Sequence, residues 1–158
     1  MKLLPIKIII AIAILCLGAA GSYAAYFVAY NNWTKGINED LVKSQQAYTD
    51  KIGKSTDTYA LVKNGKRLME NKMLDFANTN LTRATEIDAN YRDAWVCLGY
   101  TALKMNNTSR ALEALKKAES LDPIYATTYE LLNLAYKQNK DPDSAQKAQE
   151  KFEFLTKK

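Results

Sequence analysis

The side chains that most often carry enzyme chemistry are scarce in this chain of 158 residues. It has no histidine, and its only cysteines are Cys16 and Cys97. Two thiols are too few for a four-ligand zinc site, and neither has an imidazole to activate it as a nucleophile. The motif Asn64-Gly65-Lys66 lacks the earlier glycine and the later hydroxyl residue of a phosphate-binding loop. We therefore predict that the protein is not an enzyme and holds no metal and no cofactor.

The positive charge of the chain does not indicate nucleic-acid binding. The formal net charge is +5 and the isoelectric point is about 9.1. Lys2 and Lys7 supply two of these charges from the first thirty residues, which contain no acidic residue, and the rest of the chain carries only +3. Basic and acidic residues alternate along that remainder, without a face that combines aromatic and basic side chains. We predict no nucleic-acid partner.

An uncharged apolar segment of 22 residues, 8–29, precedes the polar part of the chain. As a helix it would span roughly 33 Å, which is the thickness of a bilayer's hydrocarbon core. Lysines precede it and aromatic residues follow it, as at a membrane interface. We expect residues 1–30 to be a transmembrane signal-anchor that contacts the membrane through residues 8–29. The short leading tail favours a single-pass protein whose carboxyl-terminal domain is exported, either periplasmic or extracellular.

Two other interpretations of this segment remain open. Residues 8–17 could be the apolar region of a cleaved signal peptide, with small residues near Gly21 or Ala24 at the cleavage site, or the segment could be a buried helix of a soluble core. Small residues also recur four apart at Gly21, Ala25 and Ala29, a spacing that permits close helix association in lipid and hence homo-oligomers.

A polar connector follows over residues 31–57. Asn38 can cap a helix there, and Leu41, Tyr48 and Ile52 give that helix a thin apolar stripe. Residues 53–57 indicate a break, with Thr56 or Asp57 as the next cap. The connector is either a stalk helix or the first layer of the folded domain.

The remaining chain repeats itself with a period of 34 residues. This shift superimposes Tyr91 on Tyr125 and aligns the alanines Ala77, Ala111 and Ala145. Such a period is typical of one helix pair per unit, with each unit stacked on the next. The alanines predict the places where the two helices of a pair cross closely, and Asp141 followed by Pro142 predicts a helix start.

The middle unit, 92–125, resembles the tetratricopeptide repeat. The matching residues are Trp95, Leu98, Gly99, Ala111, Ala118 and Pro123. Ala102 and Leu115 depart from the usual Tyr and Phe but keep their positions apolar. The unit before it, 58–91, has Ala89 in place of the proline, and the unit after it, 126–158, has Asn133 in place of the glycine and Gln149 in place of Phe.

This resemblance implies an all-α protein, with an α-solenoid of three helix-turn-helix repeats after the N-terminal transmembrane helix. In the family, the first helix of each pair lines a groove that binds protein or peptide segments. The positions carried over to this sequence are Tyr59, Val62, Lys66, Met69, Asp93, Val96, Tyr100, Leu103, Thr127, Glu130, Leu134 and Lys137.

Some members of the family hold a terminal carboxylate with a clamp of Lys, Arg and Asn side chains. The matching positions here carry Val62, Lys66, Cys97, Thr127 and Leu131, of which only Lys66 could serve. What remains is an apolar strip with aromatic edges, which suits an apolar or amphipathic segment. The alternative is that the connector helix or a second copy of the chain covers this strip.

We accordingly predict a membrane-anchored interaction scaffold that binds a partner protein or peptide through its groove, as an accessory subunit of an envelope or secretion assembly. The alternatives are a self-assembling structural membrane protein, whose N-terminal helix mediates oligomerisation, and a secreted soluble adaptor.

Overall fold

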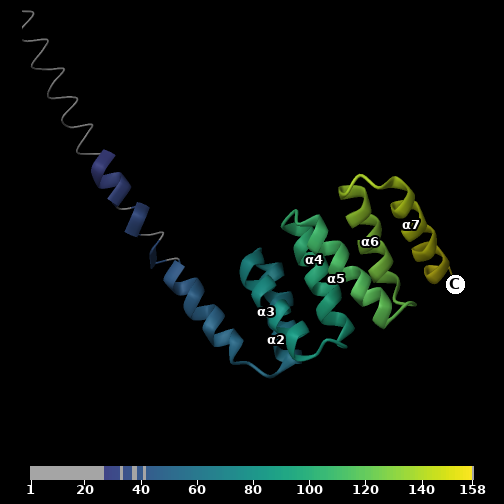
Figure 1. Cartoon of the computed structure of the whole chain (residues 1–158), viewed down its shortest axis with the longest axis horizontal. Coiled ribbons are helices and arrows are strands. Elements are labelled where there is room, and N and C mark those ends of the chain that lie inside the picture. Colours follow the sequence, from purple (N-terminus) through teal and green to yellow (C-terminus); the bar gives the residue numbers. More distant parts are fainter. Residues whose placement is uncertain (1–26, 33, 37–38, 41, 158) are drawn as a thin grey trace, which may run out of the picture. The chain divides into compact units, whose positions relative to one another are not determined.

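Helices make up nearly all of the regular structure in the part of the chain that is described. The computed structural model describes residues 27–32, 34–36, 39–40 and 42–157, and residues 42–53 form a helix. Six further helices follow (Figure 1), and none of the described residues is in a strand. These helices are α2 (Thr58–Glu70), α3 (Leu74–Ile87), α4 (Arg92–Lys104), α5 (Thr108–Leu121), α6 (Ala126–Gln138) and α7 (Pro142–Thr156). The prediction of an all-α solenoid of helix pairs is confirmed.

The helix starts follow from short polar side chains in the turns. The side chains of Asp57, Asn107 and Asp141 accept hydrogen bonds from backbone N–H groups in the first turns of α2, α5 and α7. Pro142 occupies the first turn of α7, where its missing N–H costs no helical hydrogen bond. The caps predicted at Asp57 and Asp141 are therefore confirmed.

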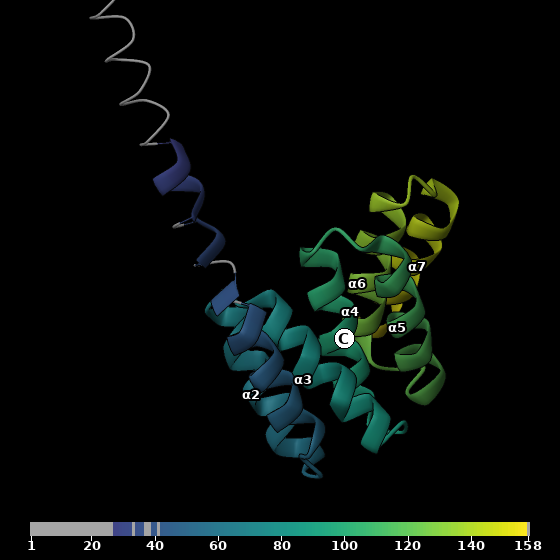
Figure 2. The ribbon, with the colours of Figure 1, turned by 60° about the vertical axis from the view of Figure 1, so that its left-hand side comes forward.

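Consecutive helices pack side by side as pairs, and the pairs stack in chain order (Figures 1 and 2). Ala77, Ala111 and Ala145 are 0 to 2% exposed, which fits the predicted close crossings within each pair. Gly99 faces Leu115 across the second pair, where a Cβ atom at position 99 would lie 2.6 Å from Leu115 Cγ. The glycine is required because a larger residue would separate α4 from α5.

In the third pair, a polar side chain takes the place of the glycine between the two helices. At the position equivalent to Gly99 it carries Asn133, which is 4% exposed. The Asn133 Nδ2 atom donates a 2.7 Å hydrogen bond to the backbone carbonyl of Ala145 on α7. This bond satisfies a buried amide and holds the last two helices together.

The end of the connector belongs to the folded unit, which extends over Tyr48–Lys158. Ile52 packs against the apolar cluster formed by α2, α3, α4 and α5, and Tyr48 contacts α2 and α3. Residues 48–53 thus contribute to the first layer of the folded domain. Leu41, the third residue of the predicted apolar stripe, lies outside the described residues.

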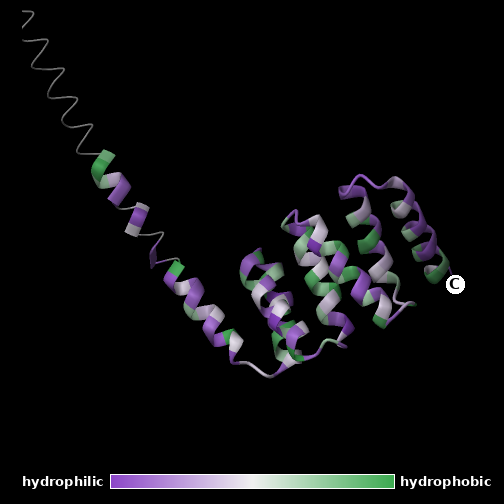
Figure 3. Cartoon of the chain, viewed as in Figure 1, coloured by the Kyte–Doolittle hydropathy of each residue, from purple (hydrophilic) through white to green (hydrophobic). Residues whose placement is uncertain are grey.

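The helices of the described residues contradict the prediction of a single-pass membrane protein. No helix among them is long and apolar enough to cross a membrane. Hydrophilic residues occur along each of α2 to α7 (Figure 3). Residues 8–26, which made up most of the predicted span, lie outside the described part of the chain.

Candidate protein-binding groove

The first helices of the three pairs, α2, α4 and α6, form one face of the stack, which we call the first-helix face. At its middle lies a pocket of about 390 Å³, the central pocket. Eight of the twelve groove residues predicted from the sequence meet there: Lys66, Met69, Asp93, Val96, Tyr100, Thr127, Glu130 and Leu134. Cys97, Tyr125 and Leu131 complete its lining.

A second pocket, of about 540 Å³, lies against α2 and is called the α2 pocket. It contains two further predicted residues, Tyr59 and Val62, and it shares Lys66 and Asp93 with the central pocket. The last two predicted residues line neither pocket. Leu103 is partly buried against the core, whereas Lys137 is exposed.

The two pockets occupy equivalent places in successive repeats but differ in chemistry. Val62 in the α2 pocket becomes Val96 in the central pocket, 34 residues later. Lys66, however, is replaced by Tyr100 at the equivalent position. The α2 pocket consequently carries several charged side chains, whereas apolar and aromatic groups dominate the central pocket.

The floor of the central pocket is apolar and nearly closed to water. Val96, Cys97 and Leu131 are 7 to 8% exposed. Burial raises the pKa of the Cys97 thiol to about 11, against the opposing effect of Lys66. The thiol is therefore neutral at pH 7 and serves as a small apolar lining group rather than a nucleophile.

The wall of the pocket contains large apolar groups that remain open to solvent. Leu134 is 48% exposed although it lies beside this apolar floor. Tyr100 lies across the pocket on α4, and the ammonium group of Lys104 is 5.2 Å from its ring centroid. An apolar side chain that entered here would be removed from water on several sides.

A chain of charges positions the remaining aromatic wall. The Arg92 guanidinium bonds Asp93 Oδ1 at 2.5 Å and Asp122 Oδ2 at 2.7 Å, and it stacks 3.7 Å from the ring centroid of Tyr125. Lys66 Nζ lies 3.9 Å from Asp93 Oδ2 on the other side. These contacts cross from α2 through α4 to the turn before α6, and they hold Tyr125 at the edge of the central pocket.

The aromatic residues at the starts of α4 and α6 were not predicted as groove residues. Tyr91 lines the α2 pocket and Tyr125 lines the central pocket. They stand one residue before the helices that carry the predicted groove positions, so a rule based on helix faces misses them. The 34-residue shift superimposes these two tyrosines, and this repetition was the sequence signal that could have identified them as groove residues.

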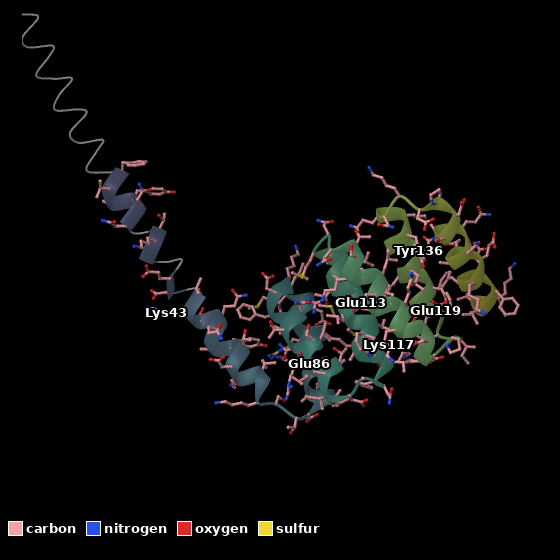
Figure 4. All side chains as sticks on the ribbon, in the orientation of Figure 1. Lys43, Glu86, Glu113, Lys117, Glu119 and Tyr136 are labelled. Carbon is pink, nitrogen blue, oxygen red and sulfur yellow. The ribbon has the colours of Figure 1, made fainter. Side chains whose placement is uncertain are left out.

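The charged side chains outside this face belong mainly to the second helices. Figure 4 shows Glu86 on α3 and Glu113, Lys117 and Glu119 along α5. Glu113 and Lys117 have the spacing of a helix-surface ion pair, but no such pair is formed between them in the described structure. Among the described residues there is also no cluster of three side chains suited to a metal ion.

Comparison with known proteins supports the repeat assignment. Residues 93–125 match the family model of the tetratricopeptide repeat. No curated protein sequence matches the chain.

Solved structures of MamA resemble the fold. A crystal structure of MamA is 25% identical, with a TM-score of 0.64, over 78% of this chain and 72% of that one. MamA from Desulfovibrio magneticus RS-1 is 21% identical, with a TM-score of 0.61, over 77% and 73%. The resemblance of the middle repeat to the tetratricopeptide repeat is thus confirmed, and the MamA structures share the helical-repeat fold.

Proposed function

We propose that the first-helix face binds a protein segment, extended or helical, and that the central pocket takes an apolar side chain of that segment. The observation that carries this proposal is the 48% exposure of Leu134 beside a floor that is almost fully buried. A large apolar side chain open to water next to an apolar hollow gains free energy when a partner covers both.

Polar groups around the rim suit a peptide backbone or polar flanking side chains. Thr127 and Glu130 on α6 and Asp93 on α4 line the same pocket as Leu134. Hydroxyl and carboxylate oxygens can accept hydrogen bonds from backbone N–H groups, which fixes the register of a bound segment. The apolar floor supplies affinity, and these polar groups supply orientation.

The α2 pocket adds a charged neighbourhood to the same face. Lys63 and Arg67 line it together with Glu70 and the Lys66–Asp93 pair. A segment that continues from the central pocket toward α2 would therefore place polar or charged residues there. The preferred partner is an amphipathic segment with its apolar anchor over α4 and α6.

The narrower role in an envelope or secretion assembly depended on the predicted membrane span. With that prediction contradicted, the groove alone carries the proposal. A second copy of this chain as the occupant is an outcome that the experiment below distinguishes.

The test is capture of binding proteins by the tagged full chain, quantified by mass spectrometry for the wild type, Leu134→Ala and Ile124→Ala. Ile124 is a matched control because it is 74% exposed and lines neither pocket. Loss of an anchoring side chain costs about 2 kcal/mol or more, so Leu134→Ala alone should weaken binding of the partner by roughly thirtyfold or more and deplete it from the captured proteins.

Equal capture by all three proteins would contradict the proposal. Capture of only untagged copies of the same chain, lost with Leu134→Ala, would replace the partner segment by self-association through this face.

A further inference from the structure

The first helix pair is covered at its outer end by residues 48–53, the last turns of the helical segment that precedes α2. Ile52 packs against the cluster that contains Leu61 and Leu81. The Tyr48 ring meets Phe76 edge to face, with 4.7 Å between ring centroids and 84° between ring planes. These contacts place two side chains of the connector against both helices of the first pair.

Hydrogen bonds make this contact specific. The Tyr48 hydroxyl accepts from the side-chain amides of Asn64, at 3.1 Å, and of Asn80. Asn80 is fully buried, and it also donates to the Phe76 carbonyl at 2.7 Å and accepts from Asn64 at 3.0 Å. Without Tyr48, one N–H of a buried amide would have no protein partner, which is costly in an apolar surrounding.

The same contact recurs one repeat later with other residues. A shift of 34 converts Tyr48 into Thr82 and Phe76 into Arg110, and these two side chains also meet, with a 2.6 Å hydrogen bond from Arg110 to Thr82. The helix of residues 42–53 ends at Gly53, and α3 ends at Ile87, again 34 residues later. The docked segment is therefore in phase with the second helices of the repeats.

The whole helix of residues 42–53 lacks the residues that a complete repeat requires. Ala77 and Ala84, both fully buried on α3, allow close packing against α2. The equivalent positions, 34 residues earlier, carry Lys43 and Asp50, and both are exposed. Figure 4 labels Lys43 in this segment. A helix with these charges has no close-packing face for a first helix of its own.

We propose that residues 48–53 act as the second helix of an incomplete extra repeat and seal the amino-terminal end of the solenoid. Asn64 and Asn80 are the adaptation of the first pair to this seal, because the equivalent residues inside the stack are apolar, Leu98 and Ala114. The end face is thereby closed to a second copy, so any association of chains must use another surface.

The first test measures unfolding of the full chain by denaturant. Tyr48→Phe removes only the hydroxyl group and should raise the equilibrium constant for unfolding by about threefold to tenfold. Tyr48→Thr also removes the ring contacts and should raise it by about tenfold to a hundredfold. Tyr59→Phe is the matched control for stability, since Tyr59 is 67% exposed, and it should leave the equilibrium constant for unfolding unchanged.

Hydrogen exchange gives a local readout in the same proteins. In Tyr48→Thr, the amides of residues 49–53 and of α2 and α3 should lose protection, whereas those of α6 and α7 should not. Unchanged stability and unchanged protection in both Tyr48 variants would overturn the proposal.

A variant that copies the next interface tests whether residues 48–53 follow the 34-residue period of the repeats. The quadruple variant Tyr48→Thr, Asn64→Leu, Phe76→Arg and Asn80→Ala copies the residues of the next interface into the first. If residues 48–53 occupy the place of a second helix, this variant should recover most of the stability that Tyr48→Thr loses. A quadruple variant no more stable than Tyr48→Thr would show that the segment docks outside the repeat register, and the proposal would fail.

Discussion

The middle and the last repeat place different chemistry at the same pair of positions. In the middle repeat, Gly99 lies under Leu115, which is fully buried. In the last repeat, the same two positions carry Asn133 and Gln149, and Asn133 bonds to the backbone of α7. The apolar pair suits an interface that is covered by the next layer, and the polar pair suits the last layer among the described helices.

One backbone geometry therefore tolerates two ways of closing a helix pair. Dispersion and burial hold the middle pair, which makes it sensitive to any change of volume. A directional hydrogen bond holds the last pair, which makes it sensitive to the loss of one donor. Variants that change volume and variants that remove donors should therefore act in different repeats.

The largest expected effect is that of Leu115→Ala. Removing a fully buried leucine should lower the free energy of unfolding by about 2–5 kcal/mol. Gln149→Ala, at the equivalent position, should lower it by less than about 1 kcal/mol, because Gln149 is only half-buried. Denaturant unfolding of the two variants measures the contrast, and similar losses would break the distinction between the repeats.

The dense packing of the middle repeat should also protect Cys97. With a thiol pKa of about 11 in place of the ordinary 9.0, its thiolate fraction at pH 8 is about a hundredfold below that of an exposed cysteine. Alkylation of Cys97 in the folded protein should be slower by that factor and should accelerate as the pH rises toward 11. Mass spectrometry of the peptide that contains Cys97 follows the reaction, and a rate equal to that in denatured protein would contradict the burial.

Gly99→Ala should destabilise the middle repeat in spite of a better helix former. The new Cβ would lie 2.6 Å from Leu115 Cγ and 2.7 Å from Leu115 Cδ2. Overpacking of about 1–3 kcal/mol should exceed the gain of about 1 kcal/mol in helix propensity. Combined with Leu115→Ala, the same change should cost less than it does alone, because the clash is gone. A cost that is additive in the double variant would contradict this packing account.

Asn133→Ala should lower the free energy of unfolding by about 1 kcal/mol, the usual net value of a lost hydrogen bond. The loss should appear as reduced hydrogen-exchange protection in α6 and α7. Asn139→Ala is a control in the same repeat, because Asn139 is exposed and follows α6. Protection lost equally in both variants would remove the special role of Asn133.

The smallest expected effects lie in the turns within the pairs. Lys72, Asn106 and Lys140 occupy equivalent positions with φ of 60°, 57° and 58°. Glycine adopts this left-handed conformation without strain, so Lys140→Gly should raise the free energy of unfolding by up to about 1 kcal/mol. Asn106→Gly should raise it less, because asparagine tolerates this conformation. Thermal unfolding measures both variants. A larger gain in stability from Asn106→Gly than from Lys140→Gly would contradict the account.

The repeat period predicted the parts of the fold that depend on local sequence and on regular stacking. The helix pairs, the buried alanines such as Ala111, and the cap at Asp141 all follow from spacing and residue type. The bond between Tyr48 and Asn80 could not be predicted in this way, because it joins residues 32 apart through a match of two side chains. The prediction of a single-pass membrane protein was wrong, because no helix among the described residues is long and apolar enough to cross a membrane.

The candidate site was predictable to a similar degree. The face that carries Val96, Tyr100 and Leu134 was expected from the resemblance to the repeat family, whose groove positions were carried over to this sequence. The part played by Tyr125 depends on its stacking with Arg92, which is positioned by Asp93 and Asp122. Such a chain of contacts between repeats is invisible to a pattern that treats each repeat separately.

The central claim, that the central pocket binds a partner segment, is tested most directly by site-specific crosslinking. A photoreactive amino acid is placed in the full chain at Leu134 or, as the control, at Ile124, which is more exposed but lies outside both pockets. The account predicts a crosslinked partner from position 134 and none from position 124. A partner crosslinked from position 124 but not from position 134 would contradict it.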